Sequence, residues 1–182
     1  MRPRTALASL IAVATVALGL VATAAPASAG ALDVTCVPPS SQTLTFTPPL
    51  TMTPGPVLVS ASTQYGPCTS ATVPGLTAGS RNATFPYPSL SCLDLLDSSA
   101  VTFTITWNTG QQSTISGNTT VSRVGAAVVV TITGNVTAGL FAGDAVVQTV
   151  TGAATAITLC TLGLGTVSSL YALVTLAITS AS

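Results

Sequence analysis

The sequence contains no histidine, no lysine and no glutamate, and its only charged side chains are four arginines and four aspartates. Without histidine the chain cannot build a Ser-His-Asp or Cys-His catalytic site, and without lysine it cannot build a Ser-Lys pair. Four arginines are also too few for a nucleic-acid surface or a polybasic membrane patch. We therefore expect a protein that is not an enzyme and that has no nucleic-acid partner.

The first 29 residues have the pattern of a secretory signal peptide. Arg2 and Arg4 form a short basic region, and the uncharged run "ALASLIAVATVALGLVATAA" follows them. Ala-Ser-Ala at 27–29 then supplies the small residues of a cleavage site. An uncleaved membrane anchor is the alternative, but the cleavage pattern follows the apolar run directly. We expect a mature chain of residues 30–182 that is secreted, extracellular or associated with the cell envelope.

The mature chain keeps little charge, because only Arg81 and Arg123 remain against four aspartates, a net charge of −2. Its length of roughly 153 residues suits a single domain that buries about two thirds of its unfolded surface. Hydrophobic residues make up 48% of the whole sequence, which counts against disorder. Threonine carries much of the remaining polarity, and it fits the pleated surface of a strand.

The four cysteines of the mature chain are Cys36, Cys68, Cys92 and Cys160. An even number of cysteines in an exported chain predicts two disulfides, with three possible connectivities. We favour the sequential pairs Cys36–Cys68 and Cys92–Cys160, each stabilising by roughly 3–5 kcal/mol in the chain-entropy account. A zinc site is disfavoured because there is no C-x-x-C pair and no histidine. We expect no metal and no cofactor.

The mature sequence alternates with a period of two residues almost throughout. In "VTFTITW", residues 101–107, Val101, Phe103, Ile105 and Trp107 share one face, and threonines share the other. The turn at 108–110 can return the chain into "QSTIS" as a hairpin. Further strands are expected in "SQTLTFT", which Pro48 and Pro49 should end, and in "PVLVSAST", "RNATFPYP", "NTTVSRV" and "AAVVVTITGNVT". Many short strands predict an all-β fold, an antiparallel sandwich or barrel stapled by disulfides.

Residues 159–178 form an uncharged run of twenty residues that is long enough for a membrane helix. Gly163, Gly165 and the absence of flanking basic residues count against that helix. The alternative, which we favour, is a loop followed by the strand "LYALVTLAI". Because both faces of this strand are apolar, we expect it to be covered on both sides.

The segment "SCLDLLDSS" departs from the strand pattern and favours one or two helical turns. It contains Asp94 and Asp97, the only closely spaced carboxylates. Their mutual repulsion would suit general acid–base chemistry, and calcium would be another use. A solvated turn explains the same spacing, and no EF-hand pattern is present. We therefore assign no catalytic and no metal-binding residue.

Trp107 is the only tryptophan, and it precedes an amide-rich turn. The ring could stack on a sugar while Asn108 and Gln111 bond to its hydroxyls, and we name these three residues as the candidate ligand contacts. However, Trp107 continues the apolar face of its strand without a slip in phase. The alternation therefore favours a core position for the ring.

Two resemblances add to this reading. Cys92, Trp107 and Cys160 are spaced in a way that resembles the Cys…Trp…Cys pattern of immunoglobulin-like domains, although Thr158 stands where that family places a tyrosine. The signal peptide, "SCLDLL", "TITWNTGQ" and "VTITGNVTAGLFAGD" resemble small uncharacterised secreted proteins that are common in actinobacteria. That second likeness covers most of the mature chain and implies no particular activity.

Together these features predict a secreted, non-catalytic binding or envelope-associated domain whose partner is an unknown extracellular polymer or protein. One alternative is a self-assembling coat protein, because the uncharged strands resemble self-associating segments. Another alternative is an inhibitor of secreted hydrolases, with "TPPLTMTPGP" as its binding loop. No membrane-spanning segment is expected in the mature chain.

Overall fold

The computed structural model describes residues 31–180, so the predicted signal peptide, residues 1–29, lies outside the described part. Within that part the chain forms ten strands, a short 3-10 helix, η1, and one α-helix, α1. The elements are β1 (Leu32–Cys36), β2 (Ser41–Leu50), β3 (Gly55–Tyr65), β4 (Cys68–Ser70), β5 (Gly79–Leu90), η1 (Asp94–Leu96), β6 (Ala100–Trp107), β7 (Gln112–Val124), β8 (Ala127–Gly139), β9 (Ala145–Ala153), α1 (Thr155–Thr161) and β10 (Val167–Thr179).

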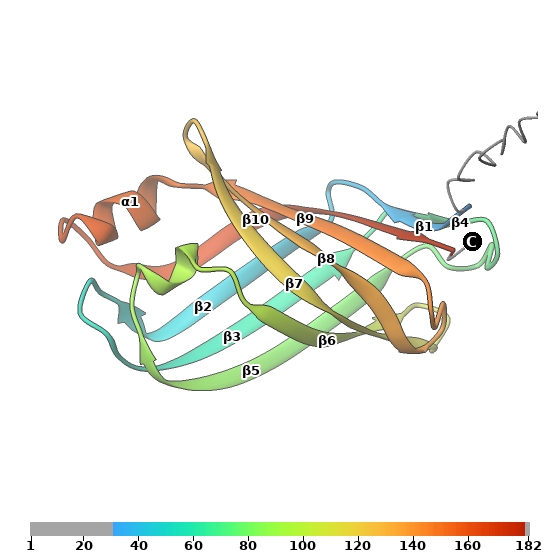
Figure 1. The fold of residues 1–182 in the computed structure, drawn as a ribbon, viewed down its shortest axis with the longest axis horizontal. Helices are drawn as coiled ribbons and strands as arrows, with labels where there is room; N and C mark the ends of the chain where they lie inside the picture. Colours follow the sequence, from blue (N-terminus) through green and yellow to red (C-terminus); the bar gives the residue numbers. More distant parts are fainter. Residues whose placement is uncertain (1–30, 181–182) are drawn as a thin grey trace, which may run out of the picture.

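Eight of these strands close into an antiparallel barrel in the order β2-β3-β5-β6-β7-β8-β9-β10, and β10 pairs with β2 to complete it (Figure 1). The first half of β10 pairs with β2, and its last residues pair with β1. β4 pairs with β1 outside the closed ladder. The prediction of an all-β fold is confirmed, and of the two predicted architectures the structure is the barrel.

Side chains alternate between the inside and the outside of the barrel, as the period of two predicts. On β6, Phe103, Ile105 and Trp107 are buried. The intervening threonines lie outside and bond across to β7, where the hydroxyl oxygens of Thr102 and Ser116 are 3.1 Å apart. Such cross-strand hydroxyl pairs stabilise the outer face of the sheet without charged side chains.

Two strands continue through positions where the sequence predicted a break. β2 continues through Pro48 and Pro49 to Leu50. Its pairing with β3 ends at Thr47, so the prolines need not donate to that ladder. Residues 112–116 and 118–124, expected as separate strands, form the single strand β7.

The C-terminal run contains the end of α1, a loop and β10, which confirms the strand alternative. Within residues 31–180 no helix is long and apolar enough to cross a membrane. The expectation that this strand is covered on both faces is wrong, because Tyr171 is 62% and Leu173 is 43% exposed. Val174, Leu176 and Ile178 face the core, whereas no other element covers the outer side chains of a barrel strand.

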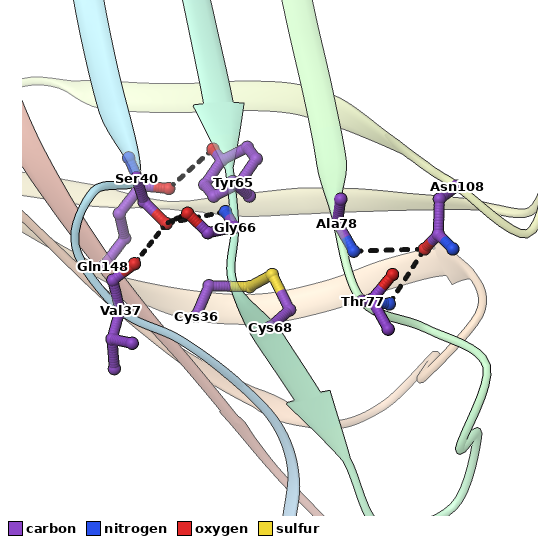
Figure 2. Close-up of a disulfide and its surroundings, with 10 residues drawn as sticks. All are labelled: Cys36, Val37, Ser40, Tyr65, Gly66, Cys68, Thr77, Ala78, Asn108 and Gln148. Carbon is purple, nitrogen blue, oxygen red and sulfur yellow. Dashed lines mark hydrogen bonds between the residues drawn. A yellow bond between two sulfur atoms is a disulfide. The ribbon is translucent and has the colours of Figure 1, made fainter.

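Both predicted disulfides are confirmed. Cys36–Cys68 joins β1 to β4 at one end of the barrel (Figures 1 and 2). Cys92–Cys160 joins the β5–β6 connection to α1 at the other end. Trp107 shares its core cluster with the first disulfide and not with the second. The spacing that resembles an immunoglobulin domain therefore does not produce that family's packing of tryptophan against the Cys92–Cys160 bridge.

Candidate functional site

The barrel encloses a cavity of about 230 Å³. Most of its wall is apolar, and its branched aliphatic lining side chains are Leu44, Leu95, Val101, Val128, Val130, Ile132, Val150, Ile157 and Leu170. Gly152, Ala153 and Ala172 leave room on the β9 and β10 side. An apolar cavity of ~150 Å³ stays dry and admits benzene, so this one has space for on the order of nine non-hydrogen atoms.

The cavity lies between three separate groups of buried side chains. One group surrounds Trp107, a second surrounds the Cys92–Cys160 disulfide, and a third contains Ile157 of α1. Leu95 and Leu170 pack against both the second and the third group, and Val130 against the first and the third. All three of these linking residues line the cavity. The space is therefore a gap between these three groups.

Arg81 is the charged residue of the cavity wall. The Arg81 side chain lies on the inner face of β5, because Arg81 pairs with Thr63 of β3, which is buried. Two residues along the strands, Gly79 pairs with Tyr65, and this pair is buried as well. The guanidinium carbon lies 4.4 Å from the centre of the Phe103 ring. The Nε atom of Arg81 is buried and has no hydrogen-bond acceptor in the described chain. The structure thus places a poorly compensated cation beside an apolar cavity.

The electrostatic surroundings of Arg81 support this description. Burial lowers the pKa of the guanidinium, while Tyr65 and Tyr87 act in the opposite direction. No carboxylate is among the groups that perturb it. Burial likewise raises the pKa of the Tyr65 hydroxyl far above its ordinary range, and the charge of Arg81 offsets part of that rise.

A second buried donor without an acceptor belongs to Gln148, the hydrogen-bond partner of Tyr65. The Tyr65 hydroxyl donates to Oε1 of Gln148 across 2.9 Å, a contact drawn in Figure 2. Nε2 of Gln148 is buried without an acceptor among residues 31–180. Arg81 and Gln148, which both interact with Tyr65, thus each leave one buried donor unpaired, and such donors are costly.

The barrel wall opens next to Arg81. β5 and β6 pair only at Gly79–Trp107 and Ser80–Thr106. Beyond that point the two strands separate, and Figure 1 shows them diverging. We call this stretch the open seam: residues 82–90 of β5 and 100–105 of β6.

Inward-facing side chains at the open seam reach solvent. Phe85 pairs with Val59 and Tyr87 pairs with Val57, so both aromatic rings lie on the inner face of β5. Phe85 is nevertheless 38% and Tyr87 is 43% exposed, because no strand faces them across the open seam. Arg81, which directly precedes the open seam on β5, and Val101, on its β6 side, both line the cavity. The cavity therefore borders the point where the β5–β6 ladder ends.

The three candidate ligand contacts proposed from sequence lie around the β6–β7 turn, and none of them lines the cavity. Trp107 is 2% exposed, as the alternation favoured. Asn108 accepts hydrogen bonds from the backbone N–H groups of Thr77 and Ala78 (Figure 2). Gln111 accepts from the Thr109 hydroxyl at 3.3 Å. The side chains of Trp107 and Asn108 therefore stabilise the fold.

The predicted helical turn is η1, in which Asp94 is the first residue, and Asp97 directly follows it as the C-cap. Oδ2 of Asp94 accepts from both the hydroxyl and the backbone N–H of Ser91, at 2.7 and 2.6 Å. These bonds lower the pKa of Asp94. Within residues 31–180, no three histidine, cysteine or acidic side chains gather as metal ligands would. The carboxylate of Asp94 therefore stabilises a turn.

A second, shallower hollow of about 200 Å³ lies on the outer surface of β2, β3 and β5. Threonine, serine, alanine and asparagine side chains line it. None of the lining residues is aromatic or charged. It therefore lacks the anchors that usually fix a ligand.

Sequence reasoning missed the cavity and Arg81. The available signal was the alternation of Arg81, Ala83, Phe85 and Tyr87, which puts the arginine in phase with aromatic residues. Strand periodicity could thus have placed the cation on the inner face. The cavity itself depends on how three distant groups of side chains pack, which periodicity does not report.

Comparison with known proteins finds no match: no family model, no curated protein and no solved structure is similar to this chain. The functional conclusion must therefore come from the geometry of the site.

Proposed function

We propose that this chain is a secreted, non-catalytic binding protein that encloses a small, largely apolar molecule inside its barrel. The observation that carries the proposal is the cavity of about 230 Å³, lined by valine, leucine and isoleucine side chains and bordering the end of the β5–β6 ladder. Concave apolar sites with a few polar groups are the usual form of small-molecule sites. The two disulfides are typical of exported proteins and support secretion.

The alternatives considered from sequence receive less support. The uncharged strands that suggested a coat protein are β8 and β10, and each pairs with neighbours on both edges. A strand paired on both edges has no free backbone groups with which to recruit another chain. The segment that suggested an inhibitor is divided between the end of β2, a four-residue loop and the start of β3, and in that loop the Thr51 carbonyl accepts from the Cys92 backbone N–H. Neither of the two hollows described above is lined by residues of that loop.

The proposal is tested by calorimetric titration of the oxidised protein with 1-octanol, a neutral probe whose size suits the cavity. We expect saturable binding of one molecule per chain. Ala172→Phe would place a ring in the cavity and should abolish binding. Leu173→Phe adds a ring to the exposed face of the same strand and should leave binding unchanged. An absence of binding to the unaltered protein, or equal effects of the two substitutions, would contradict the proposal.

A further inference from the structure

We infer that the ligand is a medium-chain carboxylic acid, bound as its carboxylate by Arg81 with its alkyl chain in the cavity. This inference rests on the proposed function, because it specifies the chemistry of the molecule inside the barrel. It is argued from the charge of the wall, the position of Arg81 and the shape of the space.

Charge is the first argument. Arg81 is half-buried, and withdrawing a cation from water is unfavourable unless a partner compensates it. Arg81 has an aromatic ring on one side, a buried Nε without an acceptor, and no carboxylate among the groups that perturb it. A ligand carboxylate would supply both the missing charge and the missing acceptors. Arginine binds carboxylates with two parallel hydrogen bonds, which a neutral head group cannot match.

The excess of donors is the second argument. Arg81 Nε and Gln148 Nε2 are the two buried side-chain donors of residues 31–180 that lack an acceptor, and Tyr65 interacts with both residues. The Tyr65 hydroxyl hydrogen is already used by Gln148. Of these residues Arg81 is the one that lines the cavity, and its unpaired Nε favours a ligand that accepts hydrogen bonds and disfavours a cationic ligand such as an alkylammonium ion.

Position is the third argument. Arg81 immediately follows Ser80, the last residue of β5 that pairs with β6, so it lies where the open seam begins. Val130, Ile132 and Val150 lie farther round the wall on β8 and β9. A head group at Arg81 would thus stay close to the solvent-accessible seam while its chain enters the apolar space. An amphiphile with one polar end fits this arrangement.

Size limits the chain. Space for on the order of nine non-hydrogen atoms corresponds to a chain of about eight carbons. Octanoate and 1-octanol therefore form a matched pair of probes, since both carry eight carbons and only one carries a charge. Their comparison separates the role of Arg81 from that of the apolar wall.

The experiment titrates the oxidised protein with each probe near pH 7, in the unaltered chain and in two variants. Octanoate should bind at least about 10-fold more tightly than 1-octanol, the range expected for hydrogen bonds to a charged group. Arg81→Gln should weaken octanoate binding by about 10- to 100-fold and leave 1-octanol binding nearly unchanged. Arg123→Gln is the matched control, because Arg123 is exposed and contacts Thr158 away from the cavity.

The outcomes separate the two proposals. If neither probe binds, the proposed function fails. If 1-octanol binds and octanoate binds no more tightly, or if Arg123→Gln weakens octanoate as much as Arg81→Gln, the inference about the carboxylate is wrong while the cavity keeps its role. Fluorescence of the buried Trp107 reports whether each variant folds. Should Arg81→Gln not fold, the two probes on the unaltered protein still decide the question.

Discussion

The indole Nε1 of Trp107 donates to the hydroxyl oxygen of Ser113 across 2.8 Å inside the barrel. Ser113 is fully buried, and its hydroxyl donates in turn to the Leu140 carbonyl at 2.6 Å. One small side chain on β7 thus satisfies both the tryptophan of β6 and the backbone that follows β8. This chain of bonds explains how the largest ring of the protein can be buried with its polar atom.

Replacing Ser113 by alanine should therefore destabilise the fold by about 2 kcal/mol, because a buried donor and a buried acceptor both lose their partner. The measurement is urea-induced unfolding followed by tryptophan fluorescence. Ser116→Ala is the control, since Ser116 bonds to Thr102 on the outer surface. Its cost should stay within about 0.5 kcal/mol. Equal losses of unfolding free energy in the two variants would show that the buried hydrogen bonds of Ser113 contribute no more to stability than the exposed one of Ser116.

Gly79 is required by the position of Trp107. A Cβ at residue 79 would lie 2.7 Å from Cε3 of Trp107 and 3.0 Å from Cγ2 of Ile105. Gly79→Ala should therefore cost about 1–3 kcal/mol through overpacking. Gly55→Ala offers the matched control, because a Cβ there meets nothing within 4 Å. Thermal unfolding of both variants checks the expectation, and a Gly79→Ala protein as stable as the control would refute it.

Asn108 fixes the loop before β5 to the β6–β7 turn. It accepts from the N–H groups of Thr77 and Ala78 and donates to the Gly75 carbonyl at 2.9 Å. Asn108→Ala should loosen residues 71–78 and lower stability by about 1–2 kcal/mol. The rate of proteolysis in this loop measures the change. Asn108→Asp, which keeps the acceptor, should be affected less, and an alanine variant cut no faster than the unaltered protein would contradict the assignment.

The Tyr65 hydroxyl makes the free energy of unfolding depend on pH in the alkaline range. Its pKa is raised in the folded state, so the folded protein keeps the hydroxyl proton at pH values where the unfolded chain releases it. The resulting stability is complete below the ordinary pKa of 10.0 and is lost as pH rises above it. Between about pH 9 and about pH 11, the unaltered protein should lose more stability than Tyr65→Phe.

Denaturant unfolding at each pH measures the slope for both proteins. Tyr171→Phe is the control for this comparison, because Tyr171 is exposed on the outer face of β10. Its slope should match that of the unaltered protein. A Tyr65→Phe protein with the same pH dependence as the unaltered chain would show that Tyr65 is not the responsible group.

The sequence was sufficient for the parts of the fold that depend on local pattern. Alternation placed Phe103, Ile105 and Trp107 inside, and the order of the cysteines suggested the correct disulfides. The local sequence pattern gave wrong predictions where the pairing and closure of the barrel determine the structure. Pro49 does not end β2, since the neighbouring ladder has already ended, and Leu173 stays exposed because nothing lies outside the barrel wall.

The candidate site was harder to predict, because it consists of a space and an opening. Arg81 is the one charged residue of β5, and although the alternation puts it in phase with Phe85 and Tyr87, only its pairing with the buried Thr63 shows that this phase is the inner face. The open seam arises because β5 and β6 share just two residue pairs. Neither the short pairing nor the gap between three core groups leaves a mark on the spacing of residues. The sequence instead suggested Trp107 as a candidate ligand contact, whereas its side chain lies in the core.

The central claim is that the cavity binds a small amphiphile, and methyl NMR of the oxidised protein titrated with octanoate tests it most directly. Methyl groups of Val130, Ile132 and Val150 line the cavity and should shift together with one saturation curve. Those of Val147 and Leu173, on the outer faces of β9 and β10, should not move. Shifts confined to the outer methyl groups, or no shifts at all, would contradict the account.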